Sequence, residues 1–182
     1  MTHFLKLLTQ VILAPKNGWE DIDAESDYSS AVLSRGLVPL LLLTALSVFI
    51  RKIYHSDVSF ISLIQQSIIV FAAFFITIYI AEFFFSLFFI RNIAGELKPH
   101  RIRIFIYYCI GAMAMMTLLI GCVPFSPVLI LLPLYSIVVM RMGADYLEVL
   151  PERIGNFMIL SLLSVFIPPF LIIFLFGMLI GS

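Results

Sequence analysis

Long apolar runs separated by short polar segments fill the chain from Ala31 onward. Several approach the roughly 20 residues that an α-helix needs to cross the hydrocarbon core of a bilayer. The composition agrees, because the chain is 62% hydrophobic and only 12% charged. A soluble domain is about half apolar and about a quarter charged. Since helices are the simplest way to satisfy backbone polar groups in lipid, the sequence predicts an all-α polytopic membrane helix bundle.

We expect about five transmembrane helices in a single bundle. They are placed at about residues 31–50, 60–88, 104–122, 126–142 and 157–179. The fourth run is short and contains Pro133, so it could instead form a re-entrant hairpin with the third. Four or six crossings therefore stay open. The predicted organisation is a cytoplasmic N-terminal segment over 1–30 and a five-helix transmembrane domain over 31–182.

The first 15 residues have the pattern of an amphipathic helix, with Phe4, Leu8 and Val11 on one face and Lys6 on the other. Such a helix is expected to lie in the membrane interface rather than to cross the bilayer. Pro15 is expected to end it. The acidic stretch 20–27 that follows is interpreted as a solvated linker, with recruitment of a basic cytoplasmic partner as the alternative.

The distribution of lysine and arginine predicts the orientation of the chain. If the segments alternate between the two sides of the membrane, nine basic residues fall on the side of the N-terminus and two on the other. The nine are Lys6, Lys16, Arg35, Arg91, Lys98, Arg101, Arg103, Arg141 and Arg153, and the two are Arg51 and Lys52. Because positive charge accumulates on cytoplasmic loops, we expect the N-terminus inside and the C-terminus outside.

Motifs for catalysis or cofactor binding are lacking in the sequence. The three histidines, His3, His55 and His100, are scattered, and none belongs to a metal-binding pair such as H-E-x-x-H. There is no G-x-S-x-G elbow and no phosphate-binding glycine loop. The 11 basic and 11 acidic residues balance, so no nucleic-acid footprint is evident. We therefore expect a protein that is not an enzyme, needs no cofactor and binds no nucleic acid.

Glu82 is the one acidic residue within a long apolar run, "YIAEFFFSLFFIR". A carboxylate at membrane depth costs several kcal/mol unless it is paired or reached by water. Gln65, Tyr79 and Ser86 fall on multiples of seven residues, and Glu82 lies between the last two, which predicts one polar stripe facing other helices.

The candidate intramembrane polar site consists of Glu82, Tyr79, Gln65, Ser86 and Arg35. Glu82 is expected near the inner boundary of the membrane, at the level of Arg35. The favoured interpretation pairs Glu82 with Arg35 or with a basic side chain of the 91–103 segment. The alternative is a proton or cation site lined by Glu82, Tyr79 and Gln65.

The segment 91–103 concentrates basic residues beside the membrane. Arg91, Lys98, Arg101 and Arg103 are candidate contacts for lipid head groups. Each basic residue near an anionic surface contributes about 1 kcal/mol of attraction. Ordinary positive-inside bias would explain the same residues without a ligand.

Two clusters of residues, in this order and spacing, resemble the Yip domain family of Ypt/Rab-interacting membrane proteins, especially its bacterial branch. The first is "LAPKNGWEDIDAES" followed by "RGLVPL", with Pro15, Trp19 and Ile22. The second is "LYSIVVMRMGADYLEVLPERI", with Gly143 and Leu147. The runs "YIAEFFFSLFF" and "IYYCIGAMAMM" stand where the family has its second and third spans. The resemblance covers nearly the whole chain.

The resemblance implies a five-span fold, a cytoplasmic N-terminus and a role in membrane organisation. Eukaryotic members carry an Asp-Leu-Tyr-Gly-Pro-type motif before the first span, where this chain reads "SRGLVPL". Rab binding is therefore not carried over.

We expect a non-enzymatic scaffold or adaptor in a bacterial cytoplasmic membrane, in contact with membrane lipids. A protein partner at the cytoplasmic face and a homo-oligomer are open possibilities. The alternative function is a small transporter, channel or lipid-moving protein that uses the polar site around Glu82.

Overall fold

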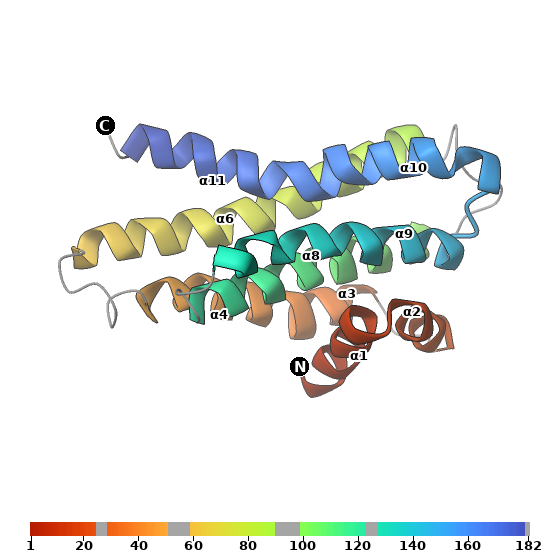
Figure 1. Cartoon of the computed structure of the whole chain (residues 1–182), viewed down its shortest axis with the longest axis horizontal. Coiled ribbons are helices and arrows are strands. Elements are labelled where there is room, and N and C mark those ends of the chain that lie inside the picture. Colours follow the sequence, from red (N-terminus) through yellow and green to blue (C-terminus); the bar gives the residue numbers. More distant parts are fainter. Residues whose placement is uncertain (25–28, 51–58, 90–98, 123–126, 181–182) are drawn as a thin grey trace.

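The computed structural model describes residues 1–24, 29–50, 59–89, 99–122 and 127–180 (Figure 1). Every regular element within these ranges is a helix, so the predicted all-α bundle is confirmed. Four helices are long and apolar enough to cross a membrane, at Ser29–Ile50, Phe60–Phe88, Pro99–Cys122 and Pro151–Leu179. Four of the five predicted spans therefore coincide with such helices.

Three of these long helices change their winding along their length. The first consists of α3 (Ser29–Ala31), the π-helical turn η1 (Val32–Leu37), α4 (Val38–Leu46) and the 3₁₀ turn η2 (Ser47–Ile50). The second consists of α6 (Phe60–Phe84) and the π-helical turn η3 (Phe85–Phe89). The last consists of η5 (Pro151–Arg153), α10 (Ile154–Ser161), the π-helical turn η6 (Leu162–Phe166) and α11 (Ile167–Ile180). Of the four long helices in the described residues, only α8 (Pro99–Cys122) is α-helical throughout.

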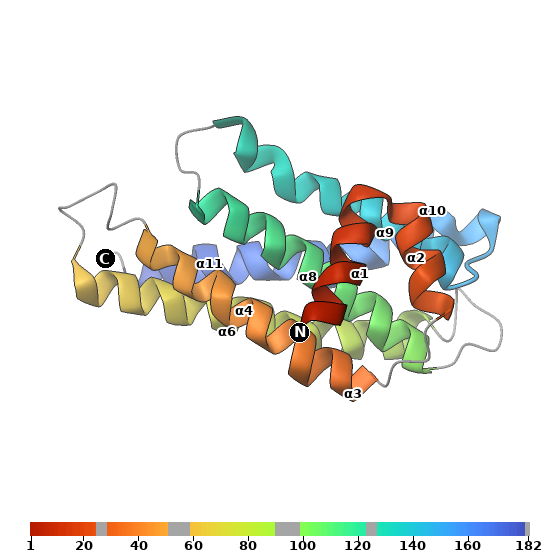
Figure 2. The same ribbon diagram turned by 90° about the horizontal axis from the view of Figure 1, so that it is seen from below.

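The predicted fourth span is not one of the four long helices. Residues 127–146 form the 3₁₀ segment η4 (Pro127–Tyr135) and then the α-helix α9 (Ser136–Tyr146). Pro133 lies inside the 3₁₀ segment, where its missing N–H removes a helical hydrogen bond. Ser136 donates from its hydroxyl to the carbonyl of Pro133 at 2.5 Å, at the junction between the two windings. The two segments pack along α8 and return the chain to the end where α8 begins (Figures 1 and 2).

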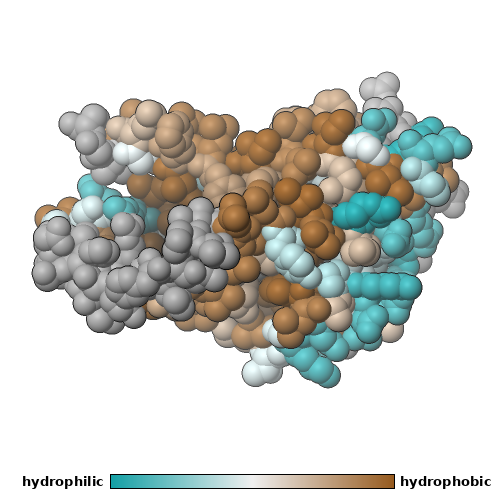
Figure 3. All heavy atoms as spheres, in the orientation of Figure 1, coloured by the Kyte–Doolittle hydropathy of each residue, from teal (hydrophilic) through white to brown (hydrophobic). Residues whose placement is uncertain are grey.

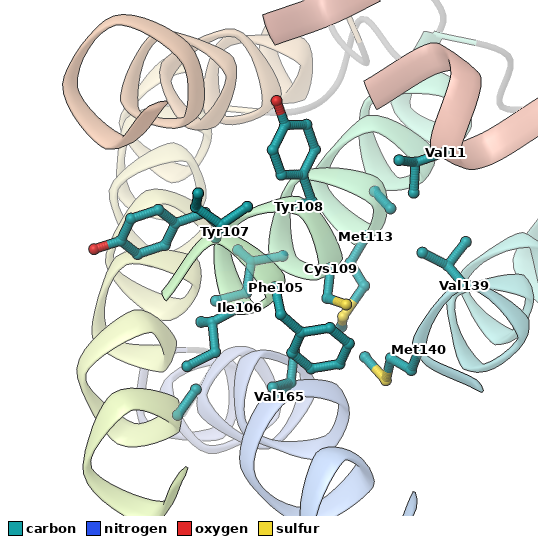
Figure 4. Packing of buried hydrophobic residues seen from close by; sticks show 14 of the residues in the cluster. Val11, Phe105, Ile106, Tyr107, Tyr108, Cys109, Met113, Val139, Met140 and Val165 are labelled. Atoms are coloured by element: carbon teal, nitrogen blue, oxygen red, sulfur yellow. The ribbon is translucent and has the colours of Figure 1, made fainter. Parts of the chain in front are cut away.

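Helix α8 is the centre of the bundle and contacts α1, α4, α6 and α9. Its residues from Ile104 to Ala114 are all buried. Figure 4 shows Phe105 and Met113 of α8 beside Met140 of α9, with Val165 from the last span approaching from another side. The core therefore consists of side chains from one central helix and the helices around it.

The N-terminal segment folds onto the bundle as a helical hairpin of α1 (Thr2–Leu13) and α2 (Pro15–Ala24). The predicted amphipathic helix is confirmed, and much of its apolar face is buried in the bundle. Its position in the membrane interface stays a prediction. Phe4 and Leu8 are buried where α1 contacts α8 and η1. Figure 2 shows α1 lying across α8. Phe4 lies so close to Gly36 that a Cβ there would stand 2.5 Å from its ring. A side chain at this glycine would push α1 away from the bundle.

The acidic stretch also differs from the prediction of a linker. Residues 20–24 belong to α2, and 25–28 lie outside the described residues. Most hydrophilic surface in Figure 3 lies at the right-hand end, where Figure 1 shows α2 and the turn between α9 and α10. Elsewhere the visible surface is mainly hydrophobic. We call the hydrophilic end the polar end.

Candidate functional site

Trp19 fixes α2 to the polar end of the bundle. Its indole is only 3% exposed and stacks on the rings of Phe105, at 5.6 Å, and Tyr146, at 5.2 Å. The ring of Tyr108 approaches it edge-on at 6.2 Å. The indole N–H donates a hydrogen bond of 3.1 Å to the carbonyl of Val139. Since a buried indole needs a partner for its N–H, this contact and the stacking together fix the position of α2 on α8 and α9.

Gly143 of α9 makes this close packing possible. A Cβ at this position would stand 2.5 Å from the Phe105 ring and 3.0 Å from the Trp19 ring. Trp19 and Ile22 of α2 and Gly143 and Leu147 near the end of α9 are all buried in this region. The two sequence clusters that resemble the Yip family, more than a hundred residues apart, therefore meet in one structural unit.

Arg101 at the start of α8 joins three parts of the chain. Its guanidinium donates to the carboxylate of Asp23 on α2 and, at 2.7 Å, to that of Glu148 after α9. It also lies 5.4 Å from the ring centre of Tyr146, within cation–π range. Glu148 has a φ of 53°, a left-handed conformation that favours glycine. The chain adopts it where α9 ends and Glu148 contacts Arg101.

Burial raises the pKa of the Tyr146 phenol to about 12, although Arg101 lowers it and Asp23 raises it further. The phenol is therefore neutral at physiological pH and packs as an uncharged ring between Trp19 and Arg101. This arrangement makes the polar end an ordered surface built from α2, α8 and α9.

A small cleft of about 160 Å³ opens on this surface between α2 and α9. Carboxylates dominate its charged lining, with one lysine among them. The lining residues are Lys16, Trp19, Glu20, Asp23, Met142, Asp145 and Tyr146. Since Asp23 is engaged by Arg101, Glu20 and Asp145 are the carboxylates of the cleft that suit a basic side chain of a partner.

Glu82 is engaged by α8 rather than by Arg35. Tyr107 donates a hydrogen bond of 2.7 Å to one carboxylate oxygen, and Arg103 Nε lies 3.9 Å from the other. Arg35 is exposed and makes no ion pair with Glu82 among the described residues. Of the two pairings expected for Glu82, the contact is therefore made by a basic residue of the 91–103 segment. Two cavities of about 330 and 270 Å³ flank the carboxylate, and both are also lined by Tyr79 and Arg103.

The predicted polar stripe on the second span, which continues from α6 into η3, does not form one buried site. Gln65, Tyr79 and Ser86 are exposed, so the prediction that the stripe faces other helices is wrong for these residues. The buried face of α6 carries Ala73, Thr77 and Ala81. Gln65 is also about 25 Å along the helix from Glu82, at 1.5 Å per residue.

The candidate lipid-contact residues fall into three groups. Arg91 and Lys98 lie outside the described residues. The Arg101 side chain is 25% exposed and engaged by the two carboxylates, whereas that of Arg103 is 56% exposed. Among these side chains, Arg103 is the more available to a head group.

Most buried hydroxyls of the described transmembrane core donate to nearby carbonyls, whereas the buried Ser161 hydroxyl of the last span has no hydrogen-bond partner among the described residues. Thr77 and Ser164 each donate to the carbonyl four residues earlier, at 2.7 and 2.6 Å. Thr44 donates to the carbonyls of Leu40 and of Ala114 on α8.

Within the described ranges, no group of three or more His, Cys, Asp or Glu side chains could hold a metal ion.

Sequence reasoning missed most of the contacts at the polar end. Tyr107 is not part of the predicted site, although it is the closest partner of Glu82. Asp23 and Glu148 carried no signal beyond their charge, because they are 78 and 47 residues from Arg101. Trp19 is named in the sequence only as part of the Yip resemblance, which does not predict its contacts with α8 and α9.

Comparisons of the chain with known protein families, curated proteins and solved structures gave no match.

Proposed function

We propose that the protein is a non-enzymatic integral membrane scaffold or adaptor of the Yip type, whose polar end docks a protein partner. The observation that carries the proposal is the Trp19 packing, which joins α2 to α8 and α9 in one ordered surface. A preorganised surface loses little conformational entropy when it binds. The hydrogen bond from Thr44 to the Ala114 carbonyl and the engaged Glu82 further support a packed bundle that acts through its end.

The proposed location is a bacterial cytoplasmic membrane, with the polar end in the cytoplasm. Figures 1 and 2 draw the C-terminus at the end of the bundle opposite to α2. A reporter enzyme that works only outside the cytoplasm should therefore be active when it is fused after Ser182. Activity of a reporter that works only in the cytoplasm, fused at the same place, would contradict this orientation.

The docking proposal assigns the cleft between α2 and α9 to a basic partner segment. A photo-crosslinking amino acid in place of Met142, at the rim of the cleft, should give a discrete crosslink to another protein in intact cells. Asp145→Lys in the same chain should remove that crosslink, because the new lysine repels a basic partner segment. The matched control carries the crosslinker at Leu171, an exposed position of α11.

The second candidate function is a small transporter, channel or lipid-moving protein, and the cavities on both sides of Glu82 favour it. Proteoliposomes loaded with a pH-sensitive dye measure proton flux directly. The scaffold proposal expects the same slow leak from wild type, Glu82→Gln and protein-free vesicles. A flux that needs Glu82, together with no charge-sensitive crosslink at the cleft, would replace the scaffold with the transporter.

A further inference from the structure

A groove of about 640 Å³ opens between the end of the second span and the start of the last span. Phe84 and Phe88 form one wall, and Ile159 and Leu163 form the other. All four side chains are exposed. This volume is within the range of about 300–1,000 Å³ that is typical of small-molecule sites.

Both walls of the groove include π-helical turns. Phe88 belongs to η3, and Leu163 belongs to η6. Such turns are rare, widen the helix locally and occur often at functional sites. Their presence on two helices that face each other indicates that the groove has a shape of its own, rather than being a gap between two regular helices.

The floor of the groove is closed towards the core. Phe85 and Phe157 are fully buried, and their rings meet edge-on at 6.3 Å. Leu160, which lines the groove, is also buried. A ligand therefore enters from the side of the bundle and goes no deeper than this aromatic layer.

The groove is polar at one end and apolar along the rest. Arg153 and Asn156 supply its polar groups, at the start of the last span and near the polar end of the molecule (Figure 1). A guanidinium has five N–H donors, so it can hold a phosphate together with another acceptor. The matching ligand carries an anionic group next to hydrocarbon.

We propose that this groove binds one glycerophospholipid from the surrounding bilayer. Its phosphate contacts Arg153 and Asn156, and one acyl chain lies between the Phe84–Phe88 wall and the Ile159–Leu163 wall. Charge complementarity favours a phospholipid over a neutral lipid, because the charged residue among the described lining residues is a cation, Arg153. This lipid site is separate from the proposed protein docking cleft on α2 and α9.

Native mass spectrometry of the full chain, released from detergent micelles, tests the proposal. Titration with palmitoyl-oleoyl phosphatidylglycerol should give one tightly bound lipid per chain before weaker ones. Arg153→Ala should weaken that first site about tenfold, since charge-assisted hydrogen bonds are the strong ones. The matched control is Arg35→Ala, another exposed arginine, which should bind as wild type does.

A second pair of variants tests the apolar half of the groove. Ile159→Trp should fill the groove and weaken the first site, whereas Leu171→Trp on α11 should leave it unchanged. Circular dichroism should show that each variant keeps the helical content of the wild type. Loss of lipid binding is then distinguished from unfolding.

Binding of three related ligands identifies which part of the lipid is recognised. Phosphatidylethanolamine should also bind, dioleoylglycerol should bind at least tenfold more weakly, and glycerol 3-phosphate should not bind measurably. Equal binding of dioleoylglycerol, or an unchanged first site in Arg153→Ala, would overturn the proposal. The proposal would also be overturned if the wild-type chain were a lipid-free dimer and the Ile159→Trp variant a monomer. A second copy of the chain would then occupy the groove. None of these results depends on the crosslink at Met142, so the two proposals can fail independently.

Discussion

Helix α8 and the last span differ in what surrounds them. In the most apolar part of Pro99–Cys122, 67% of the residues are buried inside the protein, against 28% for Pro151–Leu179. The last span nevertheless has the higher mean hydropathy. Of these two helices, the one with the higher mean hydropathy is therefore the one on the outside of the bundle, and the other forms the core.

The reason lies in the solvent. Lipid chains are as apolar as a leucine side chain, so helices in a bilayer gain little from hiding hydrophobic surface from each other. Association has to come from close packing and hydrogen bonds. Helix α8 has both, in the aromatic stacking at Phe105 and in the hydrogen bond from Thr44 to Ala114. The exposed residues of α11, such as Phe174, need only be apolar.

The largest effect should follow from removing the indole that joins α2 to the core. Trp19→Ala should lower the free energy of unfolding by about 3 kcal/mol or more, because it leaves a cavity among three rings. It also removes the donor to the Val139 carbonyl. Unfolding by sodium dodecyl sulfate in mixed micelles, followed by circular dichroism, measures the change.

Phe174→Ala is the matched control, since it removes an aromatic ring that is 59% exposed on α11. It should change stability by about 0.5 kcal/mol or less. Equal losses for the two variants would show that the polar end is no better packed than the outer surface.

A smaller loss of stability is expected when a methyl group is added at Gly143, and no loss when one is added at Gly177. Gly143→Ala places a Cβ 2.5 Å from the Phe105 ring and should cost about 1–3 kcal/mol through overpacking. Gly177→Ala has no atom within 4 Å of the new Cβ and should be neutral or slightly stabilising, because alanine favours helix. The same unfolding experiment compares the two. A tolerated Gly143→Ala would mean that α2 and α9 can separate without loss.

Four of the five spans could be predicted because they depend on local properties of the sequence. An apolar run of sufficient length must be a helix in lipid, wherever its neighbours are. The position of α1 could not be predicted in this way. Its amphipathic pattern fits lipid or protein equally well, and the choice depends on Gly36 and Gly111, which contact Phe4 from distant parts of the chain.

The polar stripe on α6 illustrates the same limit. A seven-residue repeat identifies side chains that share a face, but it does not say which face meets the bundle. Helix α6 buries the face with Ala73 and Ala81. The expected pairing of Glu82 with the 91–103 segment was based on charge alone. It therefore included Arg103 but not Tyr107, whose hydroxyl lies closer to the carboxylate.

The smallest effect is expected from the ion pairs of Arg101, although they join three chain segments. Asp23 and Glu148 are largely solvated, so Arg101→Gln should lower stability by only about 1 kcal/mol or less. Arg35→Gln, at an exposed arginine for which the described residues provide no ion pair, is the control and should have no effect.

Salt separates the charge contribution from the packing contribution of Arg101. Raising the salt from about 0.05 to about 0.5 M shortens the screening length severalfold, so the cost of Arg101→Gln should shrink. The cost of Trp19→Ala should not, because stacking and cavity formation involve no net charge. If Arg101→Gln were the costlier variant, and increasingly so at low salt, ion pairs rather than the buried indole would hold the hairpin. The stability of the polar end would then depend on ionic strength, unlike that of the lipid-facing helices.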